Sequence, residues 1–111
     1  ERVEMSSENL SAVLAGMHDL PTDVAVSQYF KNCIVDAAAK TGTIQTGDTK
    51  NNNGAFVCFA PYDDPQIAVA IVIEKGGSGA ALASTAVQVL NAYFSNTSAS
   101  SAITGENTLL G

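Results

Sequence analysis

The spacing of apolar residues predicts an amphipathic helix near the start of the chain. Apolar side chains recur there at intervals of three and four residues, at Leu10, Val13, Leu14 and Met17. This spacing puts them on one face of a helix. Ser6 or Ser7 is a suitable N-cap, and Pro21 ends the helix at about Asp19.

A shorter helix and a first strand are predicted next. The helix covers Asp23 to Lys31. Three of its side chains are expected to turn inward: Val26, Tyr29 and Phe30. Residues 34–45 are then predicted to be extended, and residues 47–54 form a polar loop rich in turn-forming residues.

Two further strands follow, over residues 55–60 and 67–74, with an acidic turn at Tyr62 to Pro65 between them. The later strand is apolar at nearly every position, so it is predicted to be buried on both faces. Short connections between the three strands predict an antiparallel meander.

The glycine-rich stretch from Gly76 to Gly79 predicts a turn into a long helix, with Ser78 as its N-cap. It lacks the lysine of a P-loop and the glycine spacing of a dinucleotide-binding loop. The helix is expected from Ala80 to about Phe94. Its predicted apolar face consists of Leu82, Ala83, Ala86, Val89, Leu90 and Tyr93.

These elements predict an α+β fold, a three-stranded antiparallel meander with flanking helices. Residues 1–94 are expected to form one folded unit. Residues 95–111 are rich in Ser, Thr and Asn and are predicted to be a flexible tail.

Charge narrows the functions that this chain can have. Eleven acidic residues against five basic ones give a formal net charge of −6, and the basic residues are scattered. Nucleic acids and anionic membrane surfaces require clustered Lys and Arg, so neither is expected as a partner. The longest apolar run, Ile67–Ile73, is too short to span a bilayer. The residues after Glu1 do not have the apolar core of a signal peptide.

Cys33 and Cys58 lack the spacing of a zinc site, so no metal and no cofactor are expected. A disulfide between them is compatible with the sequence, but two buried thiols are favoured. Asp63 and Asp64 precede a proline and are interpreted as turn residues rather than as a metal site. His18, the single histidine, is interpreted as a favourable charge at a helix C-terminus.

The segment Lys40-Thr41-Gly42-Thr43 has the composition of one wall of an acyl-transfer site. Strand alternation puts Lys40 and Gly42 on one face and the two threonines on the other. An ammonium group attracts a substrate carboxylate, and hydroxyls can bind it. A glycine lets an acyl group approach the backbone, where an N–H can stabilise an oxyanion.

The order of motifs around this segment resembles class B penicillin-binding proteins, most closely the penicillin-binding protein 2 group. The similarity covers roughly residues 3–94. It rests on an aromatic-rich strand with Ala60-Pro61, an acidic turn, an apolar strand ending in Glu74, and the glycine-rich turn before the last helix. Upstream, Ser7-Glu8-Asn9-Leu10 and Gly16-Met17 are similar to the family's preceding helix.

This resemblance implies a serine D,D-transpeptidase that cross-links peptidoglycan stem peptides and is acylated by β-lactams. It assigns Lys40 to the third active-site motif and the Thr43 N–H to half of the oxyanion hole. Thr41, Gly42 and Thr43 would bind the substrate, whose peptide would pair with the edge of this strand. The parent protein would act at the extracytoplasmic face of the bacterial cell membrane, anchored by a segment absent here.

The nucleophile that the family requires is missing from this sequence. Its motif is Ser-x-x-Lys, but the residues three positions before the four lysines are Gln28, Ala37, Gly47 and Val72. Ser7-Glu8-Asn9 matches the family's Ser-x-Asn in letters only, because it begins a helix. We therefore expect a C-terminal fragment of a transpeptidase that is inert alone.

Two alternatives stay open from the sequence: a complete non-catalytic binding or assembly module, and a fragment of a serine β-lactamase or D,D-carboxypeptidase. A fragment separated from the remainder of its transpeptidase domain should expose apolar surface. Self-association or domain swapping is therefore expected for the isolated chain.

Overall fold

The computed structural model describes residues 1–47, 52–75 and 77–106, with residues 97–106 as backbone only. Helix α1 spans Ser7–Asp19, the short 3-10 turn η1 spans Leu20–Thr22, and α2 spans Ser27–Phe30. The strands follow as β1 (Ala38–Ile44), β2 (Asn53–Ala60) and β3 (Ile67–Ile73). A second 3-10 turn, η2 (Gly79–Leu82), leads into α3 (Ala83–Glu106).

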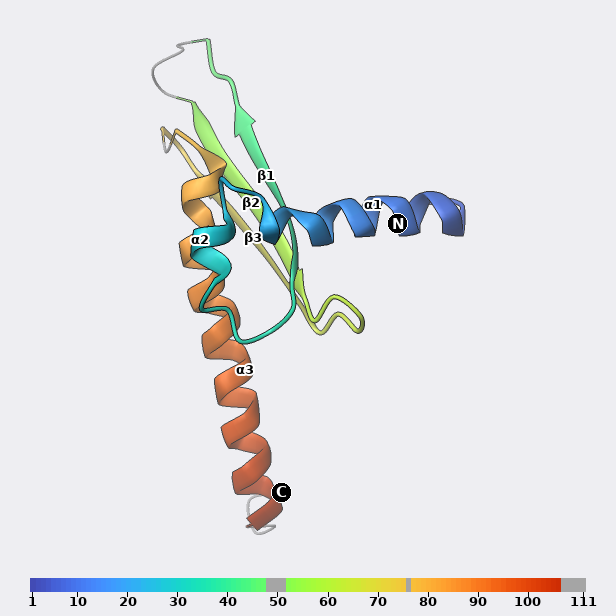
Figure 1. Cartoon of the computed structure of the whole chain (residues 1–111), viewed down its shortest axis with the longest axis vertical. Coiled ribbons are helices and arrows are strands. Elements are labelled where there is room, and N and C mark those ends of the chain that lie inside the picture. The colour runs from blue at the N-terminus through green and yellow to red at the C-terminus, as the bar shows by residue number, and fades with distance from the viewer. Residues whose placement is uncertain (48–51, 76, 107–111) are drawn as a thin grey trace.

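The three strands form an antiparallel sheet in the order β1-β2-β3, as the short connections predict. Pairing runs from Ala38 opposite Phe59 to Ile44 opposite Asn53 on one side of β2, and from Gly54 opposite Ile73 to Ala60 opposite Ile67 on the other. Helix α3 lies along one side of the sheet, whereas α1 projects from it at a steep angle (Figure 1). The α+β prediction is confirmed.

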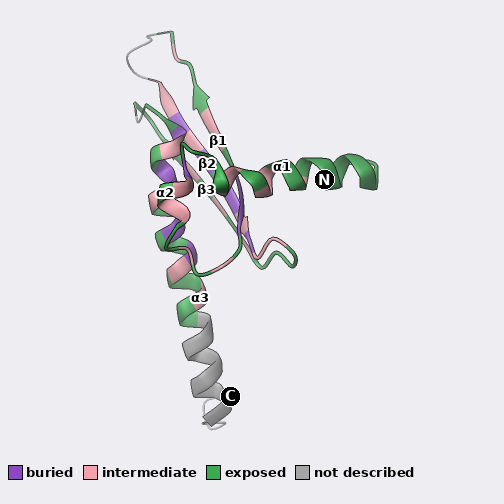
Figure 2. Ribbon diagram, viewed as in Figure 1, coloured by how far each residue is buried: buried purple, intermediate pink, exposed green. Residues whose placement is uncertain are grey.

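The hydrophobic core lies between α3 and the sheet. Alternate positions of the central strand β2 face it, and Phe56 is fully buried. The remaining buried members are mostly small: Val26, Ala37, Ala39, Cys58, Ala60, Leu82, Ala83, Ala86 and Leu90. Small side chains on both sides let the helix backbone approach the strands closely. Purple, buried segments accordingly lie mainly in the sheet and in the part of α3 beside it (Figure 2), with a few buried residues, such as Val26 and Ala37, in the connecting segments.

The structure corrects the prediction that β3 is buried on both faces. Its residues alternate between half-buried and exposed, and none is fully buried. Ile67, Val69 and Ile71 turn toward the core, while Ala68, Ala70 and Val72 face outward. Residue composition suggested two covered faces, but in the described part of the chain α3 covers only the inner face of β3, and its outer face has only the end of α1 at Met17 nearby.

Helix α1 begins and ends as predicted, with the Ser6 hydroxyl accepting a hydrogen bond from the Asn9 N–H at 3.2 Å. Its apolar stripe is present but uncovered: Leu10 is 47% exposed and Val13 is 52% exposed. No residue of α1 is fully buried. The helix is therefore attached to the rest of the molecule mainly through its C-terminal end.

The largest differences from the predicted boundaries are in three elements. Helix α2 is shorter than residues 23–31, although Val26, Tyr29 and Phe30 do contact the core. Strand β1 starts at Ala38 rather than at residue 34, because residues 34–37 form a linker. Helix α3 continues past Phe94 to Glu106. The flexibility predicted for residues 95–111 stays a prediction, and residues 107–111 lie outside the described part.

Within the described residues, no helix combines the length and apolar character needed to cross a membrane.

The contrast between neighbouring residues of α3 tests the position of the core. Leu90 is fully buried, whereas Val89 is 40% exposed. Leu90→Ala should lower the free energy of unfolding by about 2–5 kcal/mol, because it removes buried methyl groups and leaves a cavity. Val89→Ala should change it by less than about 1 kcal/mol. Urea unfolding followed by circular dichroism measures both, and equal losses would contradict this packing.

Candidate functional site

The Lys40–Thr43 segment lies in the middle of β1, at an edge of the described sheet. Lys40 and Thr43 are exposed, and Thr41 and Gly42 are half-buried. No other described strand pairs with the outer side of β1. Its backbone on that side is consequently available to a peptide that binds as an additional strand.

The two faces of β1 carry different chemistry. Thr41 and Thr43 pair with Phe56 and Gly54, which face the core, so both threonines are on the α3 side of the sheet. Lys40 pairs with Val57 and belongs to the opposite, outer face. Its Nζ atom donates a hydrogen bond of 2.8 Å to the carbonyl oxygen of Thr41. The alternation predicted from the sequence is therefore present.

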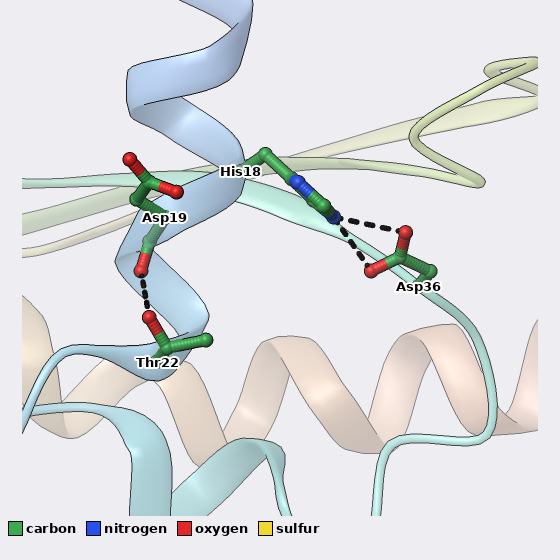
Figure 3. A network of polar contacts seen from close by, with 4 residues as sticks. All are labelled: His18, Asp19, Thr22 and Asp36. Carbon is green, nitrogen blue, oxygen red and sulfur yellow. Dashed lines mark hydrogen bonds and ion pairs between the residues drawn. The ribbon is translucent and has the colours of Figure 1, made fainter.

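The start of β1 is held by a cluster that joins three segments distant in sequence. His18, in the last turn of α1, places Nε2 2.9 Å from both carboxylate oxygens of Asp36, two residues before β1 (Figure 3). The ring of His18 stacks on Tyr62, with centroids 3.9 Å apart. The Tyr62 N–H donates to the carbonyl oxygen of Asp36 at 2.9 Å. The strand is thus anchored where it begins.

The same view shows a hydrogen bond at the C-terminal end of α1. The hydroxyl of Thr22 donates a hydrogen bond of 2.7 Å to the carbonyl oxygen of Asp19 (Figure 3). Sequence reasoning placed His18 correctly near the helix C-terminus but missed its partners. Nothing local in the sequence pairs His18 with Asp36, since the two residues are brought together only by folding.

Asn91 of α3 fixes the linker that leads into β1. Its side-chain oxygen accepts a hydrogen bond from the Ile34 N–H, and its side-chain nitrogen donates to the carbonyl oxygen of Asn32, both at 2.9 Å. One amide therefore satisfies two backbone groups of an irregular segment. In the sequence, the only sign of this contact is a polar residue directly after the apolar Leu90.

A pocket of about 610 Å³ lies beside this linker and is lined by residues of η1 and α2, by Lys31 and by residues 33–37. None of the residues from Lys40 to Thr43 lines it. The predicted site is therefore an exposed strand edge and not part of this pocket. The roles proposed for Lys40, Thr41, Gly42 and Thr43 stay predictions.

The remaining candidates from the sequence have simple surroundings. Asp63 and Asp64 are exposed in the turn between β2 and β3. Among the described residues, no group of three His, Cys, Asp or Glu side chains is arranged to hold a metal ion. Both cysteines are free thiols. Cys58 is buried as predicted, but Cys33 is only half-buried.

The solved structures most informative for comparison are penicillin-binding proteins. The chain superimposes on PBP2 of Helicobacter pylori in its complex with MreC with a TM-score of 0.73, at 24% identity over 82% of this chain and 18% of that one. For Pseudomonas aeruginosa PBP2 in complex with WCK 5153, the TM-score is 0.70 at 29% identity, covering 84% of this chain and 21% of that one. The fold is therefore that of the penicillin-binding transpeptidases.

The family model for the penicillin binding protein transpeptidase domain matches residues 1–94, so the chain belongs to that family. It is 32% identical over 90 residues to the peptidoglycan D,D-transpeptidase MrdA of Escherichia coli (strain K12), covering 68% of this chain and 14% of MrdA. It is 31% identical over 81 residues to penicillin-binding protein 2A of Bacillus subtilis (strain 168), covering 65% of this chain and 11% of that relative.

These comparisons confirm the resemblance to class B penicillin-binding proteins of the penicillin-binding protein 2 group. The matched region of this chain corresponds to 14% of the length of MrdA, about one seventh.

The titration of Cys58 gives a test of its surroundings. Burial, followed by the charge of the neighbouring Cys33, raises the pKa of Cys58 to about 11, against a smaller lowering effect of the backbone at Val69. An unfolded thiol ionises near pH 8.5. Between these values the unfolded state binds fewer protons, so the free energy of unfolding should fall as pH rises.

Urea unfolding at pH 7.5 and pH 10 measures this loss of stability. Cys58→Ala should show a smaller loss over the same interval, because it removes the shifted thiol and leaves the other titrating groups in place. The same pH dependence in both proteins would show that Cys58 is not protected in this way.

Proposed function

We propose that this chain is the C-terminal part of the transpeptidase domain of a serine-type D,D-transpeptidase that cross-links peptidoglycan stem peptides. The observation that carries the proposal is the Lys-Thr-Gly-Thr sequence on the exposed edge strand of this fold. The relatives named as peptidoglycan D,D-transpeptidases support this reaction over that of a β-lactamase or carboxypeptidase.

In the proposed mechanism, β1 binds the substrate or a β-lactam along its edge. The Lys40 ammonium attracts the ligand carboxylate, and the hydroxyls of Thr41 and Thr43 hydrogen-bond to it. Gly42 adds no side chain that would block the acyl group. The Thr43 N–H is one of two donors to the oxyanion that forms when a serine attacks the carbonyl carbon.

The attacking serine comes from outside this chain. The sequence contains no Ser-x-x-Lys, so it lacks the family's nucleophile and the lysine that activates it. The uncovered stripe of α1 and the outward face of β3 support a fold that continues into further protein, since apolar faces of this kind are normally covered. In the complete protein, that remainder would supply the nucleophile.

The parent protein is proposed to act at the extracytoplasmic face of the bacterial cell membrane, where peptidoglycan is assembled. A role in maintaining cell shape follows from the same assignment. Its proposed partners are stem peptides, β-lactams and the remainder of the transpeptidase domain.

Labelling with a fluorescent β-lactam tests the assignment. The isolated chain should show no covalent adduct by intact mass spectrometry, because it has no nucleophile. The complete polypeptide should gain the mass of one β-lactam at a serine. A stable adduct on the isolated chain would refute its proposed inertness, and a complete polypeptide that is never acylated would refute the transpeptidase assignment.

Within the complete polypeptide, Lys40→Ala should reduce the acylation rate constant roughly 10- to 100-fold, the size expected for losing one charged hydrogen bond. Lys31→Ala provides the matched control, because Lys31 is an exposed lysine outside β1. It should leave the rate within about twofold of the unchanged protein. Equal effects of the two substitutions would argue against a role for Lys40.

The uncovered stripe of α1 also predicts self-association of the isolated chain. Leu10→Lys should lower the average mass measured by light scattering, because it places a charge on the exposed apolar stripe. Ser11→Lys adds the same charge at an exposed polar neighbour and should have little effect. A monomer at every concentration of the unchanged chain would contradict this prediction.

A further inference from the structure

The first residue of η2 packs directly on the backbone of the β1–β2 pair. A Cβ atom added to Gly79 would lie 2.5 Å from the Gly42 carbonyl oxygen and 3.0 Å from the Gly42 nitrogen, and closer still to the Ala55 carbonyl oxygen. Gly42 and Ala55 are paired across the two strands. Gly79 therefore contacts the Lys40–Thr43 segment from behind, at its glycine.

Close approach, rather than an unusual backbone angle, is what requires glycine at this position. Among the described glycines, Gly77 has a positive φ of 75° but open space around it, whereas Gly79 has no such φ and is buried. The atoms around Gly79 belong to backbone, so they cannot rotate away as a side chain could. An added methyl group would have to move either η2 or the strands.

The elements on either side of this contact differ in how firmly they are held. The Ser78 hydroxyl accepts a hydrogen bond of 3.2 Å from the Ala80 N–H, and the following residues Leu82 and Ala83 are buried in the core. Strand β2 pairs on both sides, but β1 pairs on one side only. Of the two strands that Gly79 contacts, β1 therefore has fewer strand neighbours, and beyond its anchored start at Asp36 it can shift more easily than β2 when this contact tightens.

We propose that Gly79 is a positioning residue for the Lys40–Thr43 segment. Its lack of a side chain lets the η2 backbone support β1 at Gly42, and this contact sets where the edge strand lies relative to the core. The inference rests on the proposed function for its catalytic consequence: the Thr43 N–H and the two threonine hydroxyls keep their places only if β1 does.

Three glycine-to-alanine substitutions form a graded series for the test. Gly16→Ala is the control, because an added Cβ meets no atom within 4 Å. Gly54→Ala is intermediate, since its Cβ would lie 3.4 Å from the Gly79 nitrogen and from the Ser78 carbonyl group. Gly79→Ala is the most severe. In this chain, the changes in the ¹H–¹⁵N amide shifts of residues 41–43 should be smallest for Gly16→Ala, larger for Gly54→Ala and largest for Gly79→Ala.

In the complete polypeptide, Gly79→Ala should lower the β-lactam acylation rate constant at least tenfold, and Gly16→Ala should leave it within twofold. Rates are measured well below each thermal midpoint and again with a stabilising osmolyte. Restoration of the rate by the osmolyte would indicate a loss of folded protein and overturn the positioning role. So would amide changes confined to η2 and α3, or a folded Gly79→Ala protein with an unchanged rate.

If Gly79→Ala does not fold, the same measurements on Gly54→Ala decide the question. Smaller changes in the same direction are expected. Unchanged amide shifts of residues 41–43 and an unchanged rate would overturn the proposal. Failure of the unchanged complete polypeptide to react with β-lactams would count against the proposed function instead. The amide shifts in the isolated chain test the support of β1 independently of that result.

Discussion

The close packing of α3 and η2 on one face of the sheet is the constraint on which the rest of the structure depends. It is made possible by small residues, because alanines on both surfaces and a glycine at the start of η2 allow backbone to approach backbone. Phe56 and Leu90 fill the space that remains and are fully buried. Close-packed interiors transmit small displacements, which is the basis for the proposed dependence of the edge strand on the η2 backbone behind it.

The candidate site combines an exposed strand edge with a preceding segment that is held by hydrogen bonds. β1 has no strand on its outer side in the described sheet, yet the segment that leads into it is fastened twice: residues 32–34 by Asn91, and Asp36 by His18 and Tyr62. A strand that must accept a peptide needs free backbone groups in a fixed place. The proposed peptide binding to β1 is compatible with this arrangement, in which contacts from α1, α3 and the β2–β3 turn hold the start of the strand.

The two faces of the sheet differ in how far they are covered. This difference explains why the apolar composition of β3 wrongly predicted burial on both faces. A fully apolar strand is typical of a sheet covered on both sides, but Ala68, Ala70 and Val72 are exposed here, as is much of the α1 stripe. In a chain that matches a transpeptidase domain and spans only a small part of its relatives, uncovered apolar positions are reasonable.

The sequence by itself determined the order of elements, the antiparallel pairing, a cap at Ser6 or Ser7, the cap at Ser78 and the alternation of Lys40 with Thr41. These features depend on local spacing, hydrogen bonding near in sequence and short connections. Only the tertiary structure decided the boundaries of β1 and α3, the partners of His18 and Asn91, and the contact of Gly79 with Gly42. Those contacts join residues many positions apart, and no local pattern of side chains specifies which distant backbone atoms folding will bring within reach.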